Sequence, residues 1–449
     1  MATIAHKDLF HFDHPVKSYW EATAAPLGIE TPPLKGETVT DVAIIGAGFT
    51  GLSAALRFRD DYDLDVTVLD AADPGWGASG RNGGFVGLGS AKLSYGELIK
   101  RYGLEDTKRF FEIQKEAVAL VGEVTKRHGI ACDHNPMGEM AVAHRPGRFE
   151  ELKEDQVFLR DVIGKKTELL DVPAMKERGC YSPAFHGAIW GEVGASVHPL
   201  NYTRGLARAA AGNRVHIHGR SRVVRWEELA DGHRLTTSSG AVLKARHVVV
   251  ATNGFTQEEV SRRHAGRLMP ALSSILVTRP LTEDERRAQG WTSLQMAYDT
   301  RKLLHYFRLL PDGRFLFGGR GGTDGSDKAA GPLERRLRHN FETLFPGWAH
   351  AEHTHFWRGY VCLTHDLVPY IGPLDEKRSV WTAIAYHGSG VAMASWSGRA
   401  VADLVAGRPE RARLPSVLGR RLKTFPLPAL RPAYLKGAYI WYDIKDNRD

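Results

Sequence analysis

Three glycines and one acid near the start of the chain have the residue types and the spacing to bind a dinucleotide. Gly46, Gly48 and Gly51 form a Gly-x-Gly-x-x-Gly pattern, and Asp70 follows nineteen residues after Gly51. Glycines at these positions permit a tight turn, a close approach of the backbone to a pyrophosphate and close packing of a helix. A carboxylate at the later position accepts hydrogen bonds from a ribose. Because that ribose needs free hydroxyls, the acid favours FAD or NAD over NADP.

The segments around these residues have the patterns of the elements that must position them. Residues 42–45 and 66–69 are short apolar runs of the kind found in buried strands. Apolar residues at helical spacing lie between the two runs. The free N–H groups at the start of such a helix bind phosphate. This order is more specific than an isolated glycine pattern, although an ordinary glycine-rich turn is the remaining alternative.

Two later glycine-rich segments could contact the same ligand. Residues 75–84 read GWGASGRNGG, and their alternative interpretation is a flexible surface loop. Residues 380–385 are a strand-like run, and HGSGV at 387–391 then opens an expected helix at about 390–406. A glycine-marked helix start without a ligand is the alternative there.

Composition bounds the class of protein. The chain has 449 residues, 43% of them hydrophobic and 25% charged, which indicates a globular protein large enough for two lobes. No apolar run approaches the roughly 18 residues of a membrane span, and the N-terminal residues contain no apolar signal region. Three scattered cysteines, Cys132, Cys180 and Cys362, cannot form a disulfide framework. These features predict a cytoplasmic protein without a membrane span.

The charge pattern gives weaker indications. The net charge is +8, and basic residues are frequent between 408 and 423. A solvated basic face is favoured over a nucleic-acid site, because no nucleic-acid motif accompanies the charge. The twenty histidines include no His-Glu-x-x-His pattern, so we expect no metal.

The order of patterns along the chain predicts two lobes. Residues 105–128 read as one long helix and 148–178 as largely helical, whereas 215–226, 234–237 and 242–251 read as strands. Residues 275–320 read as antiparallel strands. A dinucleotide unit at the start and a glycine-rich strand-to-helix turn at the end would form one domain, closed over a sheet from the middle. A large cofactor would lie between them.

Five longer segments carry a resemblance to a known family. They are IIGAGFTGLSAAL at 44–56, WGASGRNGG at 76–84, HYFRLLPDGRFLFGGR at 305–320, WRGYVCLTHDLVPYIGPL at 357–374 and AYHGSGVAMASWSGRAVADLV at 385–405. With them the chain resembles the glycine oxidase / D-amino-acid oxidase superfamily of FAD-dependent amine oxidoreductases, and within it the γ-glutamylputrescine oxidase branch. The resemblance extends over nearly the whole chain.

The resemblance implies a fold and domain boundaries. The fold class is α/β, with a Rossmann-like FAD-binding domain and a discontinuous antiparallel-sheet substrate domain, as in glutathione-reductase-like proteins. The expected FAD-binding domain comprises 37–90, 195–265 and 357–420, the substrate domain 91–194 and 266–356, and the terminal extensions 1–36 and 421–449, which would pack on the core.

The resemblance also implies which residues bind FAD. They are Gly46, Gly48, Phe49, Thr50, Gly51, Asp70 and Ala71 on the ADP half; Gly77, Ala78, Ser79, Arg81, Asn82 and Gly83 along the pyrophosphate and flavin ring; Val224 at adenine through its backbone; Thr252, Asn253 and Gly254 closing the pocket near the ADP; and Gly388, Ser389, Gly390 and Val391 at the flavin pyrimidine. Relatives of the sarcosine-oxidase type attach FAD through a cysteine. Cys362 only approximates that position, so we predict non-covalent FAD.

Two departures from the family pattern bear on catalysis. Many relatives have Gly-His-Gly where this chain has Gly-Ser-Gly at 388–390, and His387 stands just before it. The arginine that clamps a substrate carboxylate in relatives is missing from 359–362. Arg308 or Arg320 could replace it, and we predict Arg308. We predict His387, Tyr306 and Arg308 as catalytic residues, with a structural histidine and a packing tyrosine as the alternatives.

The resemblance predicts the oxidation of a C–N bond in a small-molecule amine such as γ-glutamylputrescine. The imine product would hydrolyse to an aldehyde, and oxygen would reoxidise the flavin and yield hydrogen peroxide. A dehydrogenase with another electron acceptor is the first alternative, and a binding protein without redox activity is the second. We expect neither a nucleic-acid partner nor a membrane span, and the sequence leaves the oligomeric state open.

Overall fold

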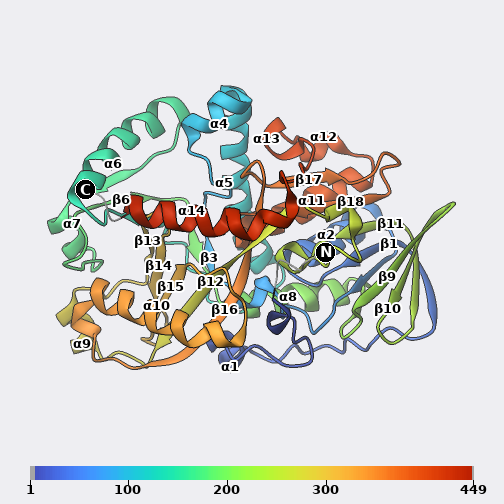
Figure 1. Cartoon of the computed structure of the whole chain (residues 1–449), viewed down its shortest axis with the longest axis horizontal. Coiled ribbons are helices and arrows are strands. Elements are labelled where there is room, and N and C mark those ends of the chain that lie inside the picture. Colours follow the sequence, from blue (N-terminus) through green and yellow to red (C-terminus); the bar gives the residue numbers. More distant parts are fainter. Residues whose placement is uncertain (1–5, 447–449) are drawn as a thin grey trace.

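The computed structural model describes residues 6–446, which form two eight-stranded sheets with helices around them (Figure 1). The first sheet has the order β17 (Tyr370–Pro373), β18 (Val380–Ile384), β11 (Val242–Val250), β1 (Glu37–Ile45), β2 (Val66–Leu69) and β8 (His216–His218), with β10 (Gly232–Thr237) joined to β11 and β9 (Val223–Leu229) joined to β10. From β18 to β8 all its pairings are parallel.

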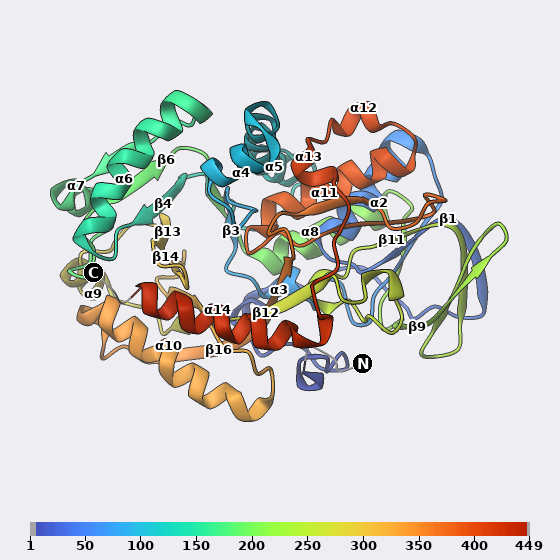
Figure 2. The same cartoon turned by 45° about the horizontal axis from the view of Figure 1, so that its top comes forward.

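The centre of the first sheet is buried on both faces. Val42, Ala43 and Ile44 of β1 are fully buried, which explains why this strand reads as a continuous apolar run rather than an alternating one. The helices that pack in this lobe are α2 (Phe49–Tyr62), α5 (Leu104–Arg127), α8 (Pro199–Gly212) and α11 (Gly390–Val405), and α2 lies against both α8 and α11. Figure 2 shows this layered arrangement from a second direction.

The second sheet is antiparallel except where β4 meets β13. Its order is β16 (His353–Thr364), β12 (Leu268–Thr278), β15 (Phe315–Arg320), β14 (His305–Leu309), β13 (Met296–Asp299), β4 (Glu139–Val142), β6 (Ala188–Gly191) and β5 (Glu168–Leu170). An aromatic core that includes Phe307, Phe317 and Phe341 fills the space between this sheet and α10 (Ala330–Leu344). Such rings bury large areas, so they hold the sheet rigidly.

The remaining elements connect and cover the two sheets. They are α1 (Tyr19–Thr23), α3 (Ala78–Arg81), β3 (Phe85–Val86), α4 (Tyr95–Tyr102), α6 (Pro146–Phe158), α7 (Val172–Glu177), β7 (Ala195–Ser196), α9 (Glu283–Gln289), α12 (Pro409–Ala412), α13 (Ser416–Gly419) and α14 (Arg431–Asp446). Both views show α14 lying across the molecule. Arg431 at its start pairs with Glu258 at 2.6 Å, and Asp446 at its end accepts hydrogen bonds from the backbone N–H groups of Lys302 and Leu303.

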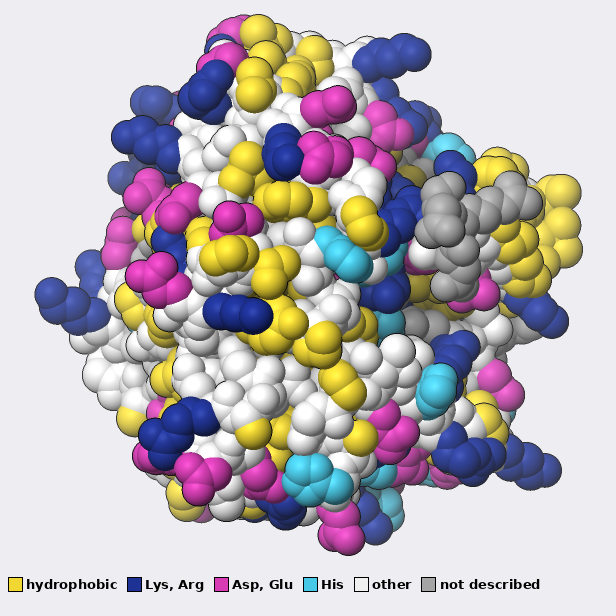
Figure 3. Space-filling view, turned by 90° about the vertical axis from the view of Figure 1, so that its left-hand side faces the viewer, with side chains coloured by type: hydrophobic (Ala, Val, Ile, Leu, Met, Phe, Trp, Pro, Cys, Tyr) yellow, Lys and Arg dark blue, Asp and Glu magenta, His cyan; other side chains and the backbone are white. Residues whose placement is uncertain are grey.

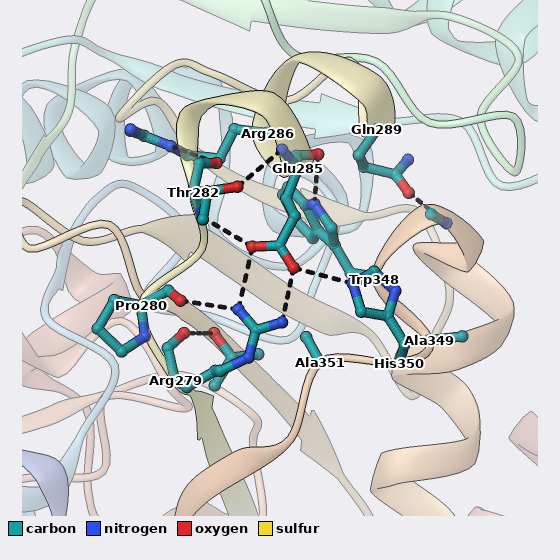
Figure 4. Close-up of polar contacts among 12 residues, drawn as sticks. Arg279, Pro280, Thr282, Glu285, Arg286, Gln289, Trp348, Ala349, His350 and Ala351 are labelled. Atoms are coloured by element: carbon teal, nitrogen blue, oxygen red, sulfur yellow. Dashed lines mark hydrogen bonds and ion pairs between the residues drawn. The ribbon is translucent and has the colours of Figure 1, made fainter.

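A polar network fixes α9 at the edge of the second lobe (Figure 4). Thr282 and Glu285 form a capping box, and Glu285 also pairs with Arg279 at 2.6 Å and lies 2.8 Å from the His350 ring. The hydrogen bonds from Arg279 lower the pKa of the Glu285 carboxyl. This network lies outside the contacts described below for the site.

The charge on the surface is mixed on the face seen in Figure 3. Lys and Arg side chains there alternate with Asp and Glu side chains, and hydrophobic side chains lie between them. Within residues 6–446, no helix combines the length and the apolar character required to span a membrane.

The predicted fold class is confirmed, and the long helix expected at 105–128 is α5. One local prediction is wrong. Residues 215–226 form two strands, β8 and β9, because the chain turns at Arg220, whose φ is 48°. Residues 148–178 are largely helical, as predicted, with the short strand β5 between the helical segments. The domain boundaries stay a prediction, although the one at 357 falls inside β16, a strand of the second sheet.

Candidate functional site

One cavity extends between the two sheets. It is lined by the turns that follow β1, β2, β11 and β18 of the first sheet, by the loop at 75–83, and by residues of β12, β14, β15 and β16 of the second sheet. Ligands of parallel α/β sheets bind outside the carboxyl ends of the strands. The cavity therefore joins that edge of the first sheet to the side chains of the second sheet.

The glycine turn leaves no room for side chains. Gly46 has a φ of 113°, and a Cβ there would lie 2.9 Å from the Ala251 carbonyl oxygen. A Cβ on Gly48 would lie 2.7 Å from Ser79 Oγ, and one on Gly51 would overlap the Gly46 carbonyl oxygen. Gly48 is also the N-cap of α2 and provides no side-chain cap; the Phe49 N–H donates to Ser79 Oγ at 3.0 Å, and the next N–H groups lack partners within the helix. These are the features of a phosphate cradle.

Asp70 lies beneath the glycine turn. Its carboxylate accepts hydrogen bonds from the backbone N–H groups of Ala47 at 2.6 Å and Ala72 at 2.9 Å. Burial raises the pKa of Asp70 to about 6. Each carboxylate oxygen keeps a further lone pair that could accept a hydroxyl of a ligand.

The loop at 75–84 is held by two of its own polar side chains. The Arg81 guanidinium donates to the carbonyl oxygens of Trp76, Gly77 and Arg358 and lies 4.3 Å from the Trp76 ring centre. Asn82 donates to the Ala78 and Ser79 carbonyls at 3.0 and 2.9 Å. Burial lowers the pKa of Arg81 to about 9. Both residues therefore shape the cavity wall, and each of the three guanidinium nitrogens of Arg81 donates to a protein carbonyl.

His387 lies in the cavity wall with both ring nitrogens engaged. Its Nδ1 is 3.2 Å from the Ser90 carbonyl, to which it donates, and its Nε2 accepts from the backbone N–H of Thr364 at 3.3 Å. Burial, together with the charge of Lys92, lowers the pKa of His387 to about 3. His387 is thus neutral near pH 7, and this is the geometry of a histidine that positions the turn before α11.

Tyr306 also lines the cavity, where its hydroxyl is 2.9 Å from Ser273 Oγ. Burial raises its pKa to about 12, so the phenol remains protonated. A Cβ on Gly83 would lie 2.9 Å from its ring. The tyrosine therefore joins the second sheet to the glycine-rich loop.

The prediction that Arg308 anchors the substrate is wrong. Its side chain is buried outside the cavity wall and donates to the carbonyl oxygens of Gly83 at 3.2 Å and Val197 at 2.7 Å. It also lies 5.5 Å from the Trp20 ring centre. We expected an anion as the partner of this guanidinium, but its partners are backbone carbonyls. Arg308 therefore supports the loop at 75–84 from the side away from the cavity. Burial lowers its pKa to about 10.

The cavity wall includes every predicted cofactor residue except Gly51, Gly254 and Val224. The two glycines lie behind the wall, where Gly51 packs α2 on the turn and a Cβ on Gly254 would lie 2.9 Å from the Tyr360 Cβ. Val223 lines the wall, whereas the Val224 side chain is 42% exposed, because successive strand residues face opposite sides. The predicted contact of Val224 with adenine is through its backbone and stays a prediction.

Sequence reasoning missed part of the wall. Lys92 and Tyr298 had no motif to mark them, and Arg320 was only an alternative to Arg308. Cys362 does line the wall, as its place in the motif at 357–374 suggested. Burial raises the pKa of the Cys362 thiol to about 12.

Comparison with known proteins gives one family. Residues 41–404 match the family DAO, described as FAD dependent oxidoreductase. The chain is 31% identical over 408 residues to a gamma-glutamylputrescine oxidoreductase of Escherichia coli (strain K12), covering 89% of this chain and 92% of that one. The fold is similar to that of glycine oxidase from Geobacillus kaustophilus, with a TM-score of 0.66, 22% identity and coverage of 83% and 95%. It is also similar to that of an L-proline dehydrogenase from P. horikoshii, with a TM-score of 0.69, 18% identity and coverage of 90% and 99%.

Proposed function

The chain belongs to the DAO family of FAD-dependent oxidoreductases, and from this premise we propose that it oxidises a primary amine of the γ-glutamylputrescine type and passes the electrons to oxygen. The substrate loses a hydride from the carbon beside its nitrogen and a proton from the nitrogen, and becomes an imine. Water hydrolyses the imine to an aldehyde and ammonia. Oxygen takes the two electrons and two protons and becomes hydrogen peroxide.

The residues of the cavity fit FAD. The glycine turn leaves the backbone bare where a diphosphate would lie, and Asp70 is placed at the end of β2 as a ribose acceptor. FAD would supply the hydride acceptor for the chemistry. Thiolate attack by Cys362 is disfavoured by its raised pKa, so we propose a non-covalent cofactor.

The chain's own residues prepare the amine. Arg320 brings positive charge to the cavity wall, and nearby positive charge lowers the pKa of a substrate ammonium. The neutral amine has the lone pair that assists hydride loss. His387 cannot reprotonate the amine through Nε2, because that nitrogen carries no proton and accepts the Thr364 N–H. Tyr298 and Tyr306 also line the cavity, where their rings would shield a bound amine from water.

The start of α11 adds an electrostatic contribution. Ser389 is its N-cap and makes no side-chain cap, and residues 388–391 are in the wall. The positive end of the helix dipole therefore points toward the cavity, where it stabilises negative charge that develops during reduction.

The observation that carries the proposal is the 31% identity to gamma-glutamylputrescine oxidoreductase over nearly the whole length of both chains. Fold similarity alone does not choose the electron acceptor, because a glycine oxidase and an L-proline dehydrogenase both share this fold. A dehydrogenase that uses another acceptor is thus the second candidate.

Anaerobic mixing of the purified yellow protein with a panel of amines tests the proposal. We expect γ-glutamylputrescine to bleach the flavin absorbance faster than putrescine, glycine or D-alanine. Admission of air should restore the absorbance and release one peroxide per substrate. Bleaching by D-alanine ahead of every γ-glutamylated amine would refute the substrate, and slow reoxidation without peroxide would favour the dehydrogenase.

A further inference from the structure

Two cations meet at one end of the cavity. Lys92 lies between β3 and α4, and Arg320 ends β15, so they come from distant parts of the chain. Both are near His387: Arg320 donates to the His387 carbonyl at 2.9 Å, and the His387 ring contacts the carbonyl of Ser90, two residues before Lys92, at 3.2 Å. The backbone N–H of Lys92 donates to the Leu367 carbonyl at 2.9 Å, which fixes this segment.

Neither cation has a carboxylate partner among residues 6–446: no Asp or Glu oxygen lies within 4.0 Å of either one. Other cations do have one: the buried Arg431 pairs with Glu258 at 2.6 Å, and the half-buried Lys165 pairs with Glu139 at 3.1 Å. Arg320 is half-buried and Lys92 is exposed, and both line the cavity, so an anionic ligand there could pair with them.

The hydrogen bonds of the arginines sharpen this contrast. Arg81 and Arg308 are buried, whereas Arg320 is half-buried and Lys92 is exposed. Three guanidinium nitrogens of Arg81 and two of Arg308 donate to backbone carbonyls. Arg320 makes one such bond, to the His387 carbonyl at 2.9 Å, and the described contacts include none from the Lys92 ammonium. A guanidinium has five N–H donors and an ammonium three, so this pair has donors left for a ligand.

We propose that Lys92 and Arg320 together bind a carboxylate of the substrate, so that the enzyme selects amines that also carry a carboxylate. This inference rests on the proposed function, since it takes this end of the cavity as the amine site. It assigns to these two residues the anchoring role that Arg308 cannot perform. A guanidinium and an ammonium on one wall are suited to the two oxygens of a carboxylate.

The lowered pKa of Lys92 agrees with this assignment. Lys92 is exposed, but the protein atoms packed around the cavity desolvate its ammonium and lower its pKa well below that of a free lysine, and Arg320 and Lys302 lower the pKa further. A bound carboxylate would reverse part of that effect and keep Lys92 protonated. FAD itself is the competing anion, because its diphosphate or its reduced ring could neutralise the same cations.

A binding titration without turnover tests the proposal. Glutarate, a dicarboxylate that cannot be oxidised, is titrated into the holoprotein while the visible spectrum of the flavin is followed, and glutaramide serves as the neutral counterpart. We expect glutarate to perturb the spectrum and to bind at least tenfold more tightly than glutaramide. Lys92→Met and Arg320→Met should each raise the glutarate Kd tenfold or more, whereas Lys92→Arg should keep it within about threefold.

Lys302→Met is the matched control. It removes a positive charge near Lys92, but Lys302 is not part of the cavity wall, and only its backbone N–H contacts Asp446. Its glutarate Kd should stay within twofold of the wild type. Lys92→Met remains informative if Arg320→Met fails to fold. Of the two residues, it is Arg320 whose guanidinium donates to the His387 carbonyl.

Three outcomes would overturn the assignment. One is an unchanged glutarate Kd in Lys92→Met, and another is failure of the wild type to bind glutarate. A lower FAD content or a shifted flavin midpoint potential in Lys92→Met, with unchanged glutarate affinity, would assign the cations to the cofactor instead. Glutarate could bind tightly in a Lys92-dependent manner while no amine bleaches the flavin. That result would refute the proposed function but would still support the anion site.

Discussion

The two ends of the cavity are constructed by different means. At the glycine turn the backbone forms the cavity wall, because Gly46 and Gly48 lack side chains and the start of α2 presents N–H groups. At the other end the wall consists of side chains such as Lys92, Tyr306 and Arg320, each from a separate element. A phosphate cradle made of backbone requires a few residue types in a fixed order, whereas a wall made of side chains can be built from many residue types at many positions. Cofactor choice is therefore encoded locally, and substrate choice is spread through the chain.

The largest expected effect is at the backbone end. A side chain at position 48 would collide with Ser79 Oγ, since even a Cβ lies 2.7 Å from it, and would fill the phosphate space. We expect Gly48→Val to weaken FAD binding roughly a thousandfold or more, about 4 kcal/mol. The purified variant should be colourless by absorbance at 450 nm. Gly147→Val, at a glycine with open space around its Cβ position, is the control and should stay yellow.

Arg308 tests whether a residue behind the wall behaves as support. Loss of its guanidinium would leave the Gly83 and Val197 carbonyls without their partners, so Arg308→Met should lower the free energy of unfolding by about 2–3 kcal/mol. Chemical denaturation of the holoprotein measures this. The glutarate Kd should change less than threefold in the folded variant. A large loss of glutarate affinity at unchanged stability would return Arg308 to the substrate site.

His387 should make the stability of the protein depend on pH. Its folded pKa is about 3, below the unfolded value of about 6.5, so the unfolded chain binds more protons between these values. The stability that comes from its neutral form is complete above pH 6.5 and is lost as the pH falls. At pH 5 the loss is about 2 kcal/mol, since each pH unit contributes about 1.4 kcal/mol.

Urea unfolding at pH 5, 6, 7 and 8 measures this dependence. In His387→Asn the slope between pH 6.5 and 5 should be smaller by about one proton, whereas replacement of the exposed His11 should leave it unchanged. Equal slopes in the wild type and in His387→Asn would show that this histidine is not held neutral.

The smallest effect is expected at Cys362, which lines the wall but whose buried thiol has a pKa of about 12. Acid precipitation should release FAD from the wild type into the supernatant, and Cys362→Ser should retain at least about 90% of the wild-type flavin. Flavin that remains with the precipitated wild type and is released from Cys362→Ser would demonstrate a covalent bond.

Sequence patterns predicted the first end of the cavity much better than the second. The glycine turn, Asp70 and the turn at 387–391 are short motifs whose function depends on neighbours in the chain. Lys92 follows a loop without a motif, and only tertiary folding brings it near Arg320 and His387. Arg308 was misjudged because the alternation along the strand predicts on which face of the sheet its side chain lies. It does not predict whether that side chain reaches the cavity or lies behind the cavity wall.

The pairing of β1 with β11 has a consequence for the time course of folding. Ile45 lies beside Val250 in this parallel pair, and the Ala251 carbonyl forms the floor under Gly46. The phosphate turn therefore cannot close until roughly 200 further residues have left the ribosome, which takes about 10–40 s at the usual rates of synthesis. Contacts so distant in sequence also form slowly. FAD should thus be captured late, by a chain that already has most of its middle segment, and a shortage of riboflavin should expose an unfinished glycine turn to proteolysis.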